Sequence, residues 1–141
     1  MTVEPKHTRN PLKIILDSNA LFVPLQFKID IFEELKTLLN MNFELFLLSP
    51  IRREIEKLAK KGTPKMRKNA SYALKLAEKC KLVEVNEEFA VSTDDVIIKF
   101  AREWNCPVFT NDRQLRKRLR DINVPVIYVR QKSRLKIDGM I

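Results

Sequence analysis

Four acidic residues each follow an apolar, strand-like segment near the point where a helical pattern begins. They are Asp17, Glu54, Asp95 and Asp112. A single Asp at such a junction is usually a helix cap that accepts hydrogen bonds from backbone N–H groups. Acids at four separate junctions instead favour a shared site, because the carboxyl ends of parallel strands meet at one edge of a sheet.

The chemistry expected of these acids follows from their charge. Carboxylates within about 6 Å repel one another, and without a counter-charge some would take up protons. A hard divalent cation relieves the repulsion, and oxygen-only ligands suit Mg²⁺ or Mn²⁺. His7 is the single histidine and Cys80 and Cys106 are isolated, which excludes serine–histidine, cysteine–histidine and histidine-rich zinc chemistry. The expected attacking group is a metal-activated water, as in two-metal nucleases.

Strand-like and helix-like segments alternate along the chain. Strand patterns cover residues 13–16, 43–48, 81–85, 107–110 and 124–129, of which 81–85 is short and half exposed. Apolar residues recur at helical spacing in the segments between them, 28–40, 51–61, 64–79, 95–104 and 112–120. The alternation predicts an α/β fold, a three-layer α/β/α sandwich around a mainly parallel five-stranded sheet.

The length of 141 residues and the hydrophobic content of 45% predict one domain with its own core. We expect a flexible N-terminal tail at 1–11, the folded domain at 12–130 and a basic C-terminal arm at 131–141. The arm is equally compatible with a loose end, an RNA contact or a dimer contact. Prolines and Asp17 interrupt the apolar runs, and the N-terminal residues lack the apolar core of a signal peptide, so we expect a cytoplasmic protein without a membrane span.

Basic residues give the chain a formal net charge of +9 and gather in two groups, one after residue 51 and one after residue 112. A lone basic helix is often only a solvated face. Two such groups in one small domain favour a polyanionic partner, and nucleic acid is the expected one. The candidate RNA-binding residues are Arg52, Arg53, Arg113, Arg116, Lys117, Arg118, Arg120, Arg130, Lys132 and Arg134.

Glu54 and three short motifs, LDSN at 16–19, TDDVI at 93–97 and FTNDR at 109–113, together resemble the PIN domain, a family of metal-dependent ribonucleases. The resemblance covers nearly the whole chain and implies a parallel sheet between helices with the acids in one pocket. It implies that the catalytic, metal-binding quartet is Asp17, Glu54, Asp95 and Asp112, with Asn19, Thr110 and Asn111 as polar supports. Asp94 is either a fifth metal ligand or a helix cap. We favour Asp95 because it directly precedes the apolar stripe, as the family's acid does.

The C-terminal third, with its basic helix at 112–120 and the strand at 124–130, is similar to the archaeal and eukaryotic PIN nucleases of small-subunit ribosomal RNA processing. The resemblance implies an endoribonuclease acting on RNA, with ribosomal precursor RNA as the first expectation. A VapC-type toxin ribonuclease controlled by a partner antitoxin is the alternative, and a catalytically weak RNA-binding module of the same fold is another. A homodimer is expected by resemblance alone.

Overall fold

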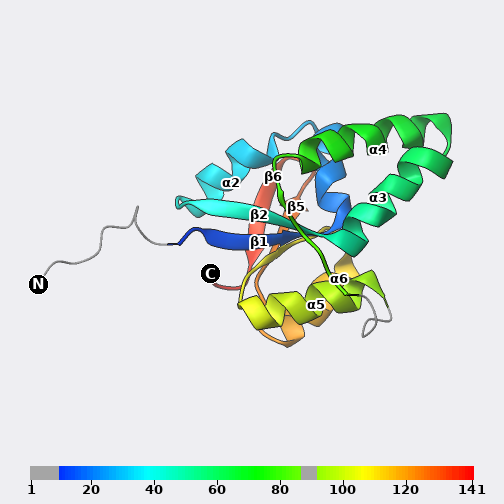
Figure 1. Cartoon of the computed structure of the whole chain (residues 1–141). Helices are drawn as coiled ribbons and strands as arrows, with labels where there is room; N and C mark the ends of the chain where they lie inside the picture. Colours follow the sequence, from blue (N-terminus) through cyan, green and yellow to red (C-terminus); the bar gives the residue numbers. More distant parts are fainter. Residues whose placement is uncertain (1–9, 87–91) are drawn as a thin grey trace, which may run out of the picture.

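A six-stranded sheet forms the centre of the computed structural model, which describes residues 10–86 and 92–141 (Figure 1). The strand order is β3-β2-β1-β4-β5-β6, and β1 to β5 pair in parallel, whereas β6 pairs antiparallel with β5. The strands are β1 (Leu12–Leu16), β2 (Phe43–Leu48), β3 (Lys81–Val83), β4 (Val108–Phe109), β5 (Val126–Arg130) and β6 (Arg134–Asp138). The order reverses between β1 and β4, where open α/β sheets form their sites.

The central strand β1 is buried on both faces of the sheet. Ile14, Ile15 and Leu16 have no exposed surface, which is the pattern of a parallel strand covered by helices on both sides. Ile15 is in register with Phe46 of β2 on one side and Val108 of β4 on the other. Because β1 is held from both sides, the residue that follows it has a fixed position.

Helices cover both faces of the sheet, as the predicted three-layer α/β/α sandwich requires. Parallel strands are joined by right-handed crossovers, so connections running in opposite directions along the sheet place their helices on opposite faces. In Figure 1, α2, α3 and α4 lie above the sheet and α5 and α6 below it. The helices are η2 (Ser18–Phe22, a 3-10 helix), α1 (Val23–Phe27), α2 (Ile31–Leu39), α3 (Ser49–Lys61), α4 (Pro64–Ala77), α5 (Thr93–Trp104) and α6 (Arg113–Asp121).

The sheet has six strands, so the predicted number of five is wrong. The extra strand, β6, comes from the segment expected to be a basic arm. Gln131 and Lys132 turn the chain back with φ angles of 54° and 58°, a left-handed backbone for which Gly and Asn are the usual residues. The segment therefore lacks the usual hairpin signal. Its alternating pattern nevertheless buries Leu135 and leaves the flanking charged residues accessible.

Two other expectations concern the ends of the chain and the membrane. Residues 1–9, most of the predicted flexible tail, lie outside the described residues, and Leu12 already belongs to β1. Within the described ranges, no helix combines the length and the apolar character that crossing a bilayer demands.

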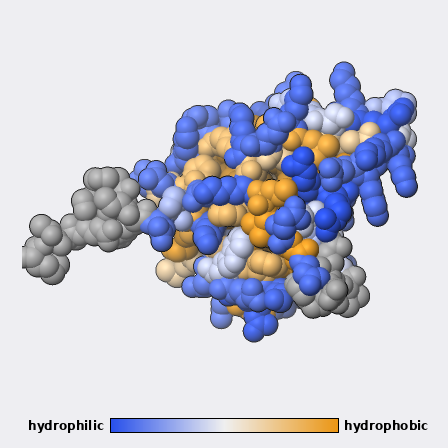
Figure 2. Space-filling model, viewed as in Figure 1, coloured by the Kyte–Doolittle hydropathy of each residue, from blue (hydrophilic) through white to orange (hydrophobic). Residues whose placement is uncertain are grey.

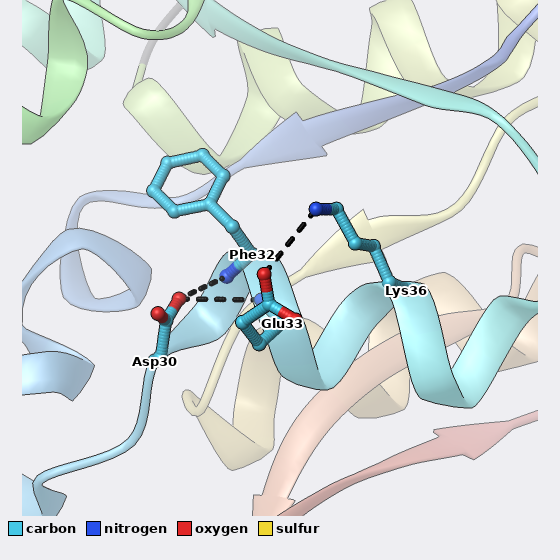
Figure 3. Close-up of polar contacts among 4 residues, drawn as sticks. All are labelled: Asp30, Phe32, Glu33 and Lys36. Carbon is cyan, nitrogen blue, oxygen red and sulfur yellow. Dashed lines mark hydrogen bonds and ion pairs between the residues drawn. The ribbon is translucent and has the colours of Figure 1, made fainter.

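The helix α2 begins at Ile31, three residues after the predicted start, because Asp30 caps it. Its Oδ1 accepts hydrogen bonds from the backbone N–H groups of Phe32 (3.1 Å) and Glu33 (3.2 Å), as Figure 3 shows. Lys28, inside the predicted helix, adopts a left-handed backbone at the end of α1 instead. Further along the same helix, Lys36 and Glu33 form an exposed ion pair at 3.2 Å.

We predict that Asp30→Ala lowers the free energy of unfolding by about 1 kcal/mol, because two N–H groups of α2 lose their acceptor. Asp30→Asn should restore most of the loss, since an amide oxygen also caps. Lys36→Ala, which removes only the exposed ion pair, should cost less than about 0.5 kcal/mol. Urea unfolding followed by circular dichroism measures all three. Equal losses for Asp30→Ala and Asp30→Asn would contradict the capping role.

Candidate active site

Asp17 lies directly after β1 and is the most buried acid described in the chain, with 6% of its surface exposed. Its Oδ1 accepts a hydrogen bond from the backbone N–H of Ser18 at 2.8 Å. Its Oδ2 accepts from the Thr110 hydroxyl at 2.7 Å and from the Asn19 amide at 3.1 Å. Because three donors converge on it, the carboxylate is held in one orientation at the edge of the sheet.

A second set of hydrogen bonds ties this carboxylate to the neighbouring strands. Asn111 donates its backbone N–H to Asn19 Oδ1 at 3.0 Å, and its own side-chain oxygen accepts from Val129 N–H of β5 at 2.8 Å. Asp112 donates its backbone N–H to Thr110 Oγ1 at 3.0 Å. The three predicted polar supports, Asn19, Thr110 and Asn111, therefore lie around Asp17 and connect the ends of β1, β4 and β5.

Asp112 serves as the N-cap of α6 and faces the same edge of the sheet. Its Oδ1 accepts hydrogen bonds from the backbone N–H groups of Gln114 (2.8 Å) and Leu115 (3.1 Å). In the described part of the chain, no donor reaches its other oxygen, Oδ2. Asp112 can therefore cap the helix with Oδ1 and still offer Oδ2 to a metal ion, so the two roles do not exclude each other here.

The pKa values of three acids are raised, and the causes show that these acids share one space. Burial is the main cause for Asp17, whose pKa is raised further by the negative charge of Asp112 against the lowering effect of its hydrogen bonds. The pKa of Glu54 is raised by loss of solvent around its carboxyl and by the charges of Asp17 and Asp94. The side chain of Thr93 donates a hydrogen bond to Glu54, which opposes this shift.

Asp94, rather than Asp95, is the acid of α5 that faces this cluster. The pKa of the Asp94 carboxyl is raised mainly by loss of solvent, and the charges of Asp17 and Asp112 raise it further. Asp95 instead lies 2.9 Å from the guanidinium of Arg118, whose hydrogen bond lowers its pKa. The charge of Arg118 also acts on Asp94, where it only partly offsets the effects of burial and of the neighbouring acids. Of the two acids, Asp94 is the one whose pKa is raised by the charges of Asp17 and Asp112, which makes it the stronger candidate ligand.

The reason for this difference is the point at which α5 begins. Ser92 is the N-cap, with its hydroxyl oxygen accepting from Asp95 N–H at 3.2 Å, so both acids are already within the first helical turn. Adjacent residues of a helix point about 100° apart. The two neighbouring acids therefore point in different directions, and spacing from the apolar stripe does not identify which of them lies nearer Asp17.

The donor set around Asp17 fits a hard divalent cation. Its candidate members, Asp17, Glu54, Asp94 and Asp112, offer only oxygen atoms. The charges of Lys57 on Glu54 and of Arg118 on Asp94 offset their mutual repulsion only in part, because the pKa values of Asp17, Glu54 and Asp94 stay raised. Across residues 10–86 and 92–141, no three acidic, histidine or cysteine side chains are already closed into a coordination sphere. The carboxylates therefore lie close enough to influence one another, but their oxygen atoms do not converge on a single point.

A groove beside Glu54 supplies positive charge that the predicted RNA-binding set omits. It has a volume of about 660 Å³ and is lined by Ser18, Glu54, Lys57 and Lys61, with Leu58, Gly62, Thr63 and Met66. The two lysines follow Glu54 at three and seven residues along α3, the spacing of a single helix face. Helical periodicity applied to Glu54 itself would have identified them. Figure 2 shows the hydrophilic side chains crowding the end of the molecule where α3 and α4 meet.

Several of the arginines predicted to bind RNA have partners within the chain. Arg116 and Arg120 both contact the carboxylate of Asp138 on β6, at 3.1 and 3.3 Å, and Arg118 contacts Asp95. Arg52 lies 3.7 Å from Glu56 of the same helix. Other members of the set have exposed side chains, namely Arg53, Arg113, Lys117, Arg130, Lys132 and Arg134.

The known proteins that this chain resembles are PIN-domain proteins and ribonucleases. A model of the PIN-like domain family matches residues 14–132. The ribonuclease VapC4 of Methanocaldococcus jannaschii is 37% identical over 92% of this chain and 98% of its own length, and the ribonuclease VapC9 of Archaeoglobus fulgidus is 29% identical over 88% and 87%. The solved structure of the PIN domain endonuclease Utp24 is 27% identical, with a TM-score of 0.77 over 93% of this chain and 94% of that one. The structure of VapBC2 from Rickettsia felis shares the fold, with a TM-score of 0.62 at 14% identity over 84% of this chain and 100% of that one.

We predict opposite effects of pH on the stability of two neighbouring variants, measured by thermal unfolding in EDTA. Because the pKa of Asp94 is raised by folding, its ionisation destabilises the native state, increasingly so as pH rises from about 4, the ordinary value for Asp. Because the pKa of Asp95 is lowered, its ionisation stabilises the native state at neutral pH, and this contribution is lost as pH falls below about 4.

Asp94→Asn should therefore melt at a higher temperature than Asp95→Asn at pH 7, and the gap should narrow toward pH 4. Both residues lie in the first turn of α5, so the loss of a favourable interaction with the helix dipole is common to the two variants. A gap of the opposite sign, or one that does not change with pH, would show that Asp94 does not face the other acids.

Proposed function

This chain belongs to the PIN-like domain family, and from that premise we propose that it is an endoribonuclease that uses a divalent metal ion to hydrolyse phosphodiester bonds in RNA. PIN-domain ribonucleases are metal-dependent hydrolases that act on RNA, so the prediction of this class of enzyme from the sequence is confirmed. The family model and both named ribonucleases match most of the chain rather than a fragment of it.

The single observation that supports this activity is that Asp17, Glu54, Asp94 and Asp112 lie within electrostatic reach of one another at one edge of the sheet. The charges of Asp17 and Asp94 raise the pKa of Glu54, and those of Asp17 and Asp112 raise the pKa of Asp94. We propose that these four acids hold the ion. Once bound, a divalent cation such as Mg²⁺ or Mn²⁺ lowers the pKa of a bound water and stabilises negative charge on the phosphate. The presence of all four acids argues against the catalytically weak binding module.

The remaining residues of the site orient the acids and attract the substrate. Thr110 and Asn19 fix the Asp17 carboxylate, and the side chain of Thr93 lowers the pKa of Glu54 and so favours its charged form. Lys57 and Lys61 line the groove into which Glu54 opens, where they attract the phosphate backbone. We propose that RNA binds with its scissile phosphate between this basic groove and the acid cluster.

Two biological roles, that of a VapC-type ribonuclease and that of a ribosomal RNA processing nuclease, are supported by different relatives. The names VapC4 and VapC9 favour a VapC-type ribonuclease that is controlled by a partner protein. The similarity to Utp24 supports the predicted role in processing of ribosomal precursor RNA. We place the VapC-type proposal first, because the curated relatives carry that name and include a chain that is 37% identical. A homodimer remains a proposal by resemblance.

We predict that cleavage of a labelled RNA by the purified protein requires Mn²⁺ or Mg²⁺ and stops in EDTA. Asp17→Asn should abolish cleavage while RNA affinity stays the same or rises, because a negative charge is removed. Asp94→Asn should lower kcat at least about 100-fold, since even outer-shell partners of a metal ligand cost 10- to 100-fold.

Asp95→Asn is the matched control for Asp94→Asn, with the same chemical change at the adjacent position. Its kcat should stay within about tenfold of that of the unmodified protein, because tenfold is the smallest loss typical of residues that support a metal ligand. Cleavage that persists in EDTA would refute the metal-dependent mechanism. A greater loss for Asp95→Asn than for Asp94→Asn would instead assign the ligand to Asp95.

The VapC-type role and the ribosomal RNA processing role lead to different expected effects when the chain is expressed alone in a bacterium. A VapC-type enzyme without its partner should arrest growth, and the Asp17→Asn variant should not, because arrest requires cleavage. Normal growth despite soluble protein that cleaves RNA in vitro would disfavour the toxin and leave ribosomal precursor RNA as the target. Colony counts after induction, with the amount of each protein checked on a gel, measure this.

A further inference from the structure

A second, smaller groove lies where α6 meets the end of β5. It has a volume of about 250 Å³ and is lined by Asn111, Arg113, Arg116, Tyr128, Arg130 and Gln131, together with Val129. The lining contains three arginines and no acidic residue. Asn111 also belongs to the hydrogen-bond network around Asp17, and Asp112 lies between Asn111 and Arg113. The groove therefore begins immediately beside the acid cluster, with the opposite sign of charge.

The β5–β6 hairpin presents a basic face toward α6. Tyr128 and Arg130 are two residues apart along β5 and so point to the same side of the sheet. Their partners across the hairpin are Lys136 and Arg134, which extend the same face onto β6. Asp138, whose carboxylate accepts a hydrogen bond from Arg116 Nε, is in register with Val126 on this same face.

Arg116 is held as a flat platform inside the groove. Its guanidinium carbon lies 3.7 Å from the centre of the Tyr128 ring, and its Nε lies 3.1 Å from Asp138 Oδ2. The side chain nevertheless keeps 32% of its surface exposed. A guanidinium that is backed by an aromatic ring and held by a carboxylate has lost most of its rotamer freedom, so a planar ligand can stack on it at little further entropic cost.

We propose that this groove binds one unpaired nucleotide of the RNA substrate next to the scissile phosphate, with its base stacked on the Arg116–Tyr128 platform and its phosphates held by Arg113 and Arg130. The inference rests on the proposed function and adds that the substrate is single-stranded at this position. Unstacked bases of single-stranded RNA stack on aromatic rings and on guanidinium planes, whereas duplex bases are already stacked on one another. Basic grooves with such platforms are how proteins bind single strands.

An acidic protein segment would also be attracted by three arginines, but it would not require a planar platform. The dependence of binding on the base therefore separates the two partners. We choose the full-length Asp17→Asn protein, which we expect to bind without cleaving, and three fluorescein-labelled probes. The probes are an eight-residue oligoadenylate, the same oligonucleotide with abasic central positions, and an oligoadenylate–oligouridylate duplex. Fluorescence anisotropy at several salt concentrations gives Kd and its salt dependence.

In the Asp17→Asn background, Arg116→Lys keeps the positive charge but removes the planar guanidinium group. It should weaken oligoadenylate binding about fivefold or more, the lower range for loss of one stacked base, and leave abasic RNA unaffected. The slope of log Kd against log salt should not change, because no cation is lost. Tyr128→Leu, which retains apolar bulk behind the arginine, should have the same base-dependent effect and serves as a second test if Arg116→Lys unfolds.

Arg113→Ala with Arg130→Ala should weaken the binding of both single-stranded probes and lower the salt slope by about 0.7 for each phosphate that the protein no longer neutralises. Arg102→Ala is the control: it removes one arginine from α5, outside this groove, and should change neither affinity nor slope. Equal losses for oligoadenylate and abasic RNA, or binding of the duplex as tight as that of the single strand, would overturn the inference.

Cleavage by the chain with Asp17 intact is scored separately, so the two proposals can fail independently. Metal-dependent cleavage without base-dependent binding in the groove would overturn the nucleotide subsite and leave the ribonuclease in place. Base-dependent binding without cleavage under any divalent ion would support the subsite and overturn the proposed activity.

Discussion

The burial of one carboxylate, Asp17, at the end of the central strand is the constraint on which the site depends. A carboxylate removed from water is unfavourable unless donors or a cation compensate it. Here Ser18, Asn19 and Thr110 provide donors, yet the pKa stays raised, so the compensation is incomplete. A fold that keeps an acid in this position, beside further acids, has a charge imbalance that a bound cation would remove.

The sheet topology explains why the other acids reach Asp17. Strand order reverses at β1 and β4, so the segments that follow these two strands diverge onto opposite faces and leave a crevice between them. Asp112 enters from the β4 side, Glu54 from α3, and Asp94 from α5. Each comes from a different connection, and none is close to another of this group in the sequence. The site therefore exists only when the parallel sheet is complete.

The basic residues fall into two groups: those that form ion pairs within the chain and those that line the two grooves. Arg116, Arg118 and Arg120 are held by Asp138 or Asp95 and so fix α6 to its neighbours. Lysines of α3 and the arginines at the ends of the second groove line the surfaces next to the acids. Negative charge at the centre with positive charge on both sides is the distribution expected for an enzyme that binds a polyanion and a metal ion together.

The sequence predicts the elements of this fold well where local chemistry determines them. The predicted helix start at residue 64 is confirmed, and Thr63 caps this helix by accepting a hydrogen bond from Met66 N–H. The helix predicted from residue 112 begins one residue later, at Arg113, because Asp112 is its cap. The sixth strand escapes prediction because its turn uses Gln131 and Lys132 in a conformation that other residues favour. The choice between two adjacent acids, and the hydrogen bond from Thr93 to Glu54, depend on helix rotation within the assembled fold, which no local pattern contains.

The most direct test of this account is a crystal structure of the protein soaked in Mn²⁺, with the ion located by anomalous scattering. We predict a Mn²⁺ peak at the carboxyl end of β1, directly coordinated by Asp17 and by Asp94, with Asp95 still bound to Arg118. The absence of a peak at that edge, or an ion coordinated by Asp95 while Asp94 points to solvent, would contradict it.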